Sequence, residues 1–74
     1  MSELVEVHIR GHRIRIRTGA DTNKEYIREV AHYVDEVMEE LMDQSTGSSY
    51  DRIAVMAAIR IADSLFRRNR WHNQ

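Results

Sequence analysis

The chain has 74 residues, no cysteine and a formal net charge of −1 at neutral pH. The absence of cysteine excludes disulfide bonds and thiolate zinc sites, which often support so small a domain, and leaves association with a second copy as the leading source of stability. No apolar run approaches the roughly 18 residues of a membrane helix and no export signal is visible, so we expect a cytoplasmic protein.

The small net charge hides a segregation of charge along the chain. Residues 1–20 carry a net charge of +2, residues 21–43 carry −6 and residues 51–70 carry +3. A molecule with this pattern is not a general binder of polyanions, although one of its faces can still be basic.

Residues 4–17 are predicted to form a β-hairpin, because apolar and polar residues alternate in two short runs. Gly11 and His12 are the expected central turn residues, since Gly-X is typical of a type II′ turn. This turn would pair Ile9 with Ile14 and put all apolar side chains on one face. The apolar residues of the two strands are Val5, Val7, Ile9, Ile14 and Ile16.

A first helix is predicted over residues 22–43. Thr22 and Glu25 have the spacing of a capping box, which favours a helix start near Thr22. Apolar residues then recur at spacings of three and four, as on an amphipathic helix. This stripe consists of Ile27, Val30, Ala31, Val34, Val37, Met38, Leu41 and Met42.

A second helix is predicted over residues 50–69, after a polar loop in which Ser48 or Ser49 can cap it. Its apolar residues cover an arc of roughly 200°, more than one hairpin and one helix can bury. An alanine at every fourth position also lets another helix approach closely. We therefore expect a homodimer in which this helix meets its copy across a two-fold axis. The expected interface residues are Ile53, Ala54, Ala57, Ala58, Ile61, Ala62 and Leu65.

The sequence contains no catalytic motif, and we expect no enzyme activity, no cofactor and no metal site. His8 and His12 are four residues apart, but a hairpin puts one on its polar face and the other in its turn, so they should not converge on a metal ion. Neighbouring acids such as Glu39 and Glu40 are interpreted as a solvated helix face rather than an acid–base pair.

Arginines at positions 13, 15 and 17 project from one face of the second predicted strand. Such a strand followed by two helices in a dimer is also the outline of a ribbon-helix-helix DNA-binding protein. The preceding strand, the long first helix and the net acidity argue against nucleic acid as the main ligand. Solvated arginines and contact with an acidic protein surface are the other two interpretations.

Three segments together carry a family resemblance: VEVHIRGHRIRIR, EYIREVAHYVDEVMEEL and DRIAVMAAIRIADSLF. In order and spacing they resemble the head domain of the ZapA family, bacterial proteins associated with the cell-division ring. The last segment is the most specific, being similar to the family's RIAVLAALNIADEL type of motif. The resemblance implies one α+β domain over residues 1–74, with a hairpin, two helices and a dimer built on the second helix.

The resemblance further implies a non-enzymatic accessory protein at the division site that promotes assembly of the ring. Its implied partner is FtsZ, the tubulin-like GTPase whose filaments form that ring. A dimeric DNA-binding protein and a plain oligomerisation domain remain as alternatives. The residues expected to contact FtsZ are Arg13, Arg15 and Arg17, with Lys24 and Arg28 as secondary contacts.

Two features of this sequence differ from the family pattern. Arg60 stands where the family usually carries Asn, beside the expected dimer interface, so its charge should reach water or an acid such as Asp63 across that interface. Family members also continue into a long C-terminal helix that pairs dimers into tetramers. For this sequence, which ends at Gln74, we expect a dimer.

Overall fold

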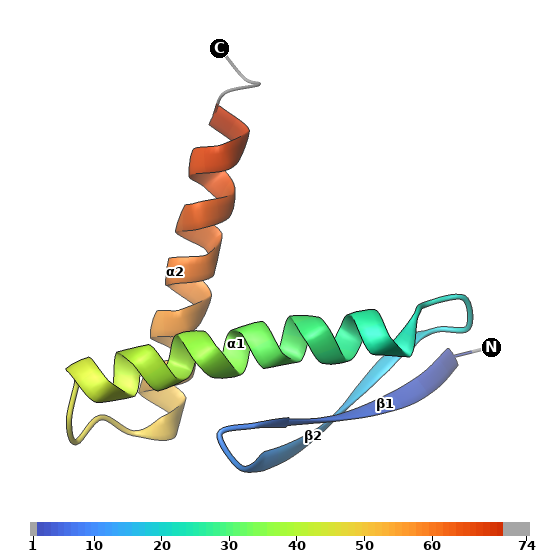
Figure 1. Cartoon of the computed structure of the whole chain (residues 1–74), viewed down its shortest axis with the longest axis horizontal. Helices are drawn as coiled ribbons and strands as arrows, with labels where there is room; N and C mark the ends of the chain where they lie inside the picture. The colour runs from blue at the N-terminus through green and yellow to red at the C-terminus, as the bar shows by residue number, and fades with distance from the viewer. Residues whose placement is uncertain (1, 71–74) are drawn as a thin grey trace.

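The computed structural model describes residues 2–70, which form a β-hairpin followed by two helices (Figure 1). The hairpin lies along one side of the first helix. The second helix crosses the C-terminal part of the first helix and then extends away from the rest of the chain (Figure 1). This arrangement confirms the predicted α+β fold. The elements are β1 (Ser2–Ile9), β2 (His12–Gly19), α1 (Lys24–Gln44) and α2 (Tyr50–Arg70).

The turn of the hairpin begins one residue earlier than predicted. Arg10 and Gly11 are the turn residues and have φ angles of 50° and 83°, as in a type I′ turn. Ile9 consequently pairs with His12 in the antiparallel ladder, and the predicted pairing of Ile9 with Ile14 is wrong. The observed register differs from the predicted one by two residues, so Val5, Val7, Ile9, Ile14 and Ile16 still share one face. Leu4 of β1 lies on the other face and is 51% exposed.

Both helices begin at side-chain caps. Asn23 caps α1, because its side-chain oxygen accepts hydrogen bonds from the N–H groups of the second and third helical residues, at 2.8 and 3.4 Å. The predicted cap at Thr22 is therefore displaced by one residue. Ser49 caps α2 through its hydroxyl, which accepts the N–H of Arg52 at 3.2 Å and confirms one of the two predicted serines.

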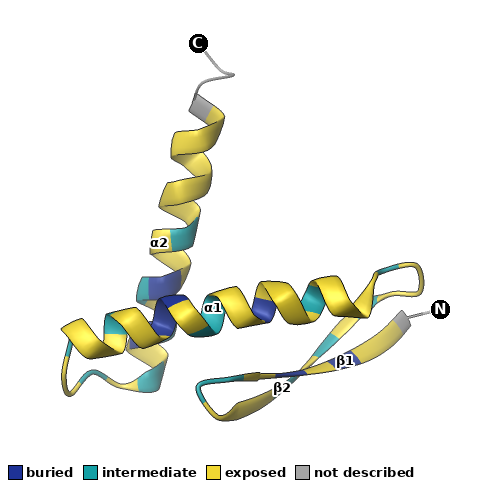
Figure 2. Cartoon of the chain, viewed as in Figure 1, coloured by how far each residue is buried: buried dark blue, intermediate teal, exposed yellow. Residues whose placement is uncertain are grey.

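Two apolar clusters, one between α1 and the hairpin and one between α1 and α2, form the core (Figure 2). Each buried aliphatic side chain stabilises the fold by about 1.5–3 kcal/mol, so α1 is the element that holds the hairpin and α2 in one unit. The cluster between α1 and the hairpin contains Val5, Val7 and Ala31. The cluster between α1 and α2 contains Val37, Met38, Ile53 and Ala57.

Tyr50, the first residue of α2, links this helix directly to the tip of the hairpin. Its hydroxyl donates a hydrogen bond to the carbonyl oxygen of Ile9 at 3.2 Å. Its ring also packs against the ring of His12, with centroids 3.8 Å apart. The start of α2 is therefore held by the hairpin as well as by α1.

Candidate protein-binding surfaces

The C-terminal half of α2 extends beyond the rest of the chain (Figures 1 and 2). Every residue from 62 to 69 is exposed. Val55, Ile59, Leu65 and Phe66 have exposed fractions of 59%, 64%, 53% and 70%. Contiguous apolar surface of this kind marks a contact with another molecule more often than a solvated helix face.

The exposed apolar side chains of α2 lie on one face. At 100° per residue, spacings of four and three place them along one side of the helix. Ile53 and Ala57, which are buried against α1, lie on the opposite side. We call the exposed face the α2 apolar stripe; its residues are Val55, Ala58, Ile59, Ala62, Leu65 and Phe66.

The seven residues predicted for the dimer interface differ in how far they are buried within one chain. Ile53 and Ala57 are 0% and 1% exposed, so α1 of the same chain already covers them. Ala54 and Ile61 are partly buried at the edge of the same cluster. The members of the predicted set that are exposed on the α2 apolar stripe are Ala58, Ala62 and Leu65.

Three exposed residues of the stripe, Val55, Ile59 and Phe66, are missing from the predicted interface. The width of the apolar arc predicted that α2 has a second partner besides its own chain, but not which half of the arc each one covers. The sequence did contain a signal for this stripe, because Val55, Ile59, Ala62 and Phe66 follow one another at spacings of four, three and four. This spacing defines a second stripe beside the one that α1 buries.

A smaller apolar surface lies on α1. Tyr26, Val30 and Tyr33 are 61%, 44% and 51% exposed. Helical periodicity places them on the same face as Val37, which packs against α2. The side of α1 that contacts α2 therefore continues, uncovered, toward the start of the helix. We call these three residues the α1 apolar patch.

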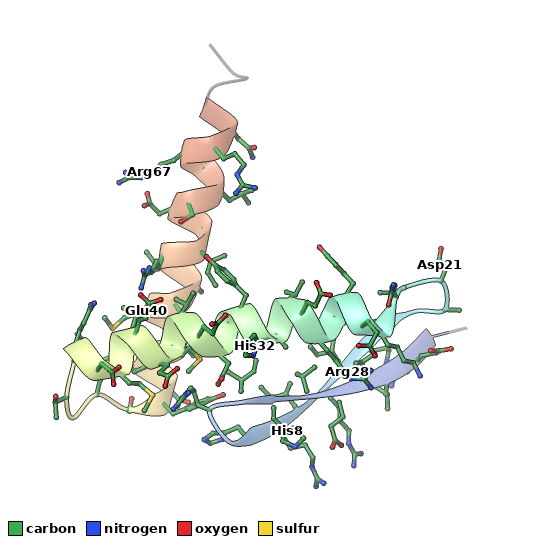
Figure 3. All side chains as sticks on the ribbon, viewed as in Figure 1. His8, Asp21, Arg28, His32, Glu40 and Arg67 are labelled. Carbon is green, nitrogen blue, oxygen red and sulfur yellow. The ribbon has the colours of Figure 1, made fainter. Side chains whose placement is uncertain are left out.

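The outer face of the hairpin, turned away from α1, carries the predicted arginines of β2. Arg13 and Arg15 are exposed, and the Nε atom of each lies 3.9 Å from Oε1 of Glu6 on β1. His8 belongs to the same outer face (Figure 3). The carboxylate of Glu6 among the guanidinium groups opposes the binding of a phosphate backbone, which argues against DNA as the ligand.

The two secondary contact residues lie near the start of α1 and are paired within the chain. Lys24 Nζ is 3.3 Å from Oε1 of Glu3 on β1. Arg28 Nη1 is 2.9 Å from Oε1 of Glu25, one turn earlier on the same helix. These pairs are exposed and therefore weak, so a stronger acidic partner can displace them.

Arg60 reaches an acid of its own chain. Its Nη2 atom lies 3.3 Å from Oε1 of Glu40 on α1, where α2 crosses that helix (Figure 3). Asp63 pairs instead with Arg67, at 3.0 Å. The charge of Arg60 is thus placed beside α1 rather than on the α2 apolar stripe.

Residues 2–70 contain no group of three or more His, Cys, Asp or Glu side chains that could hold a metal ion. In the same part of the chain, neither helix is long and apolar enough to cross a membrane.

A hairpin-and-two-helix domain with an uncovered apolar helix face is typical of small proteins that act by binding other proteins. Residues 5–74 match the model of the family described as cell division protein ZapA, and the chain belongs to this family. It is thus a cell-division protein. A solved structure, a ZapA mutant dimer from Geobacillus stearothermophilus, is similar with a TM-score of 0.76 and 27% sequence identity, over 99% of this chain and 83% of that chain. No curated protein matches the chain.

Proposed function

We propose that the chain is a non-enzymatic accessory protein of cell division that acts as a homodimer in the cytoplasm, at the division site. In this role it binds FtsZ filaments and promotes assembly of the division ring. The observation that carries the proposal is that α2 is apolar on two sides and packed on only one. Ile53 and Ala57 are buried against α1, whereas the α2 apolar stripe is uncovered.

A second copy is the proposed cover of the α2 apolar stripe. An exposed helical segment of about ten residues is marginal in water by itself and gains stability from packing of its apolar face. Ala58 and Ala62 lie on this face and allow a second helix axis to come close. The similar Geobacillus structure is a dimer, which supports self-association of this chain. Ala54 and Ile61, partly buried, border this proposed interface.

Sedimentation equilibrium of wild type and of Ala62→Glu tests the dimer. Ala62 is exposed and lies away from α1, so the added charge should leave the fold of one chain intact and oppose burial between two chains. Ser64→Glu is the matched control, since Ser64 is exposed on the same helix but on the opposite side from the stripe. We expect dimers for wild type and Ser64→Glu and a monomer for Ala62→Glu. A monomeric wild type would contradict the proposal.

The proposed FtsZ contact is ionic and uses the basic side chains of the hairpin and the start of α1. Co-sedimentation with FtsZ assembled in the presence of GTP measures it. Binding should weaken as salt rises, because the Debye length falls to about 8 Å near 0.15 M. Arg15→Glu should reduce pelleting, whereas Arg68→Glu, on the distant end of α2, should not. Absence of pelleting above the control at low salt would contradict the proposed partner. The proposed contact residues are Arg13, Arg15, Arg17, Lys24 and Arg28.

A further inference from the structure

The outer edge of β2 is open. Within residues 2–70 the sheet has two strands, so β2 pairs with β1 on one side and with no strand on the other. In this part of the chain α1 approaches the backbone of β1 and not that of β2. The β2 edge is therefore accessible to a further strand, a geometry by which sheets bind extended peptides.

The register shows which backbone groups this edge presents. Ile9 and His12 flank a two-residue turn and form a hydrogen-bonded pair, as in other hairpins of this type. Hydrogen-bonded and non-hydrogen-bonded pairs alternate from there along an antiparallel ladder. Arg13 and Arg15 belong to non-hydrogen-bonded pairs, in which they lie opposite His8 and Glu6. Their N–H and C=O groups thus point away from β1, two residues apart, as a third strand requires.

The side chains beside this edge define what a third strand should contain. Arg13 and Arg15 project from the outer face, whereas Ile14 and Ile16 lie half-buried on the inner face. Side chains of an added strand would lie next to these two rows in alternation. Acidic residues would match the arginine row, and apolar residues would extend the inner face of the sheet.

We propose that the β2 edge binds an extended peptide segment of alternating acidic and apolar residues as a third strand. The inference deepens the proposed contact of the same arginines with an acidic partner and rests on that proposal for the source of the segment. A second copy of this chain is a poor occupant of the edge. Antiparallel pairing of two β2 strands about Arg15 would set arginine opposite arginine, which destabilises a sheet.

Proline substitution separates the backbone contact from the ionic contact. Arg15→Ala removes the guanidinium group but keeps the outward N–H, whereas Arg15→Pro removes both and leaves the ladder hydrogen bonds of the hairpin in place. Glu6→Ala and Glu6→Pro form the matched control pair, since Glu6 is directly opposite Arg15 and its N–H points to the other edge. Circular dichroism and a thermal melt verify that each variant is folded.

The probe is an end-capped, fluorescein-labelled peptide of eight residues that alternate Glu and Val. Fluorescence anisotropy at about 50 mM salt, chosen to limit screening, should show saturable binding that a Lys and Val peptide lacks. We expect Arg15→Ala to weaken binding a few-fold and Arg15→Pro to weaken it at least tenfold beyond that. Glu6→Pro should bind like Glu6→Ala. Absence of saturable binding by wild type, or equal affinities of Arg15→Ala and Arg15→Pro, would overturn the inference.

Amide hydrogen exchange of the wild-type chain provides a readout that needs no variant. Saturating peptide should slow exchange at Arg13 and Arg15, whose N–H groups would enter the new ladder. Exchange at Glu6 and His8, on the opposite edge, should stay unchanged. Unaltered exchange at the two arginines would overturn the inference even if a proline variant failed to fold.

Failure of this inference and failure of the proposed function have different signatures. If the chain pellets with FtsZ but Arg15→Ala and Arg15→Pro pellet equally, the ionic contact holds and the third strand does not. If the peptide protects the β2 edge but the chain does not pellet with FtsZ, the edge is a binding site and its natural partner is another acidic protein.

Discussion

Asp35 on α1 accepts a hydrogen bond from the backbone N–H of Arg10 at the tip of the hairpin, 25 residues earlier in the chain. The other carboxylate oxygen of Asp35 lies 3.6 Å from Nη1 of the same arginine. Arg10 has a φ of 50°, a conformation that residues other than glycine adopt at a cost. The contact with Asp35 therefore supports the position of the turn from outside the hairpin.

Replacement of Asp35 should weaken the fold. Asp35→Ala leaves both the N–H and the guanidinium group of Arg10 without this acceptor in a partly buried site, and we expect a loss of about 1–3 kcal/mol in the free energy of unfolding. Asp35→Asn keeps an acceptor oxygen and should lose less. Urea unfolding at one fixed protein concentration measures both, since association also contributes to apparent stability. Equal stability of Asp35→Ala and wild type would contradict this account of the turn.

Gly11→Ala should destabilise the hairpin through backbone strain alone. Gly11 has a φ of 83°, and a Cβ atom at this position would meet no heavy atom within 4 Å. The expected loss is the left-handed penalty of an L-residue, about 1–2 kcal/mol. Gly19→Ala is the control, because its φ is not positive and its Cβ would meet only the side chains of Asp21 and Thr22. We expect a change within about 0.5 kcal/mol there, and an equal loss in both variants would exclude strain as the cause.

Local patterns were sufficient to predict the elements and, for the hairpin and α1, the face that each one buries. Alternation defined the strands, and spacings of three and four defined the helices, because both patterns repeat within one element. The position of the turn could not be predicted in this way. A turn that starts at Arg10 and a turn that starts at Gly11 bury the same face of the hairpin. The contact that favours a start at Arg10 comes from α1. No pattern within the hairpin itself contains that information.

The sequence also did not predict which face of α2 is buried and which is exposed. Ile53 and Ile59 are equally apolar, yet one is fully buried and the other is 64% exposed. Which of them α1 covers depends on where and at what angle the helices cross. The open edge of β2 has a similar origin, because it follows from the packing of α1 against β1 rather than β2.

Tyr50→Phe should weaken the link between α2 and the hairpin without opening a cavity. The substitution removes the hydrogen bond to the carbonyl oxygen of Ile9 but keeps the ring that packs on His12. A neutral hydrogen bond of this kind contributes about 0.5–1.5 kcal/mol, which is the expected loss in urea unfolding. Tyr50→Ala, which also removes the ring contact, should lose more. Identical unfolding of Tyr50→Phe and wild type would show that the hydroxyl does not contribute.

Ile53→Ala and Ile59→Ala should separate folding from association. Ile53 is fully buried by its own chain, so its truncation leaves a cavity and should cost about 2–5 kcal/mol at every protein concentration. Ile59 is largely exposed in one chain, so its truncation should act mainly by weakening the dimer. Urea midpoints at two protein concentrations, combined with sedimentation equilibrium, distinguish the effects because only association depends on concentration. If Ile59→Ala leaves the dimer dissociation constant unchanged while Ile53→Ala lowers stability as expected, the core assignment holds and the second copy must bind α2 on another face.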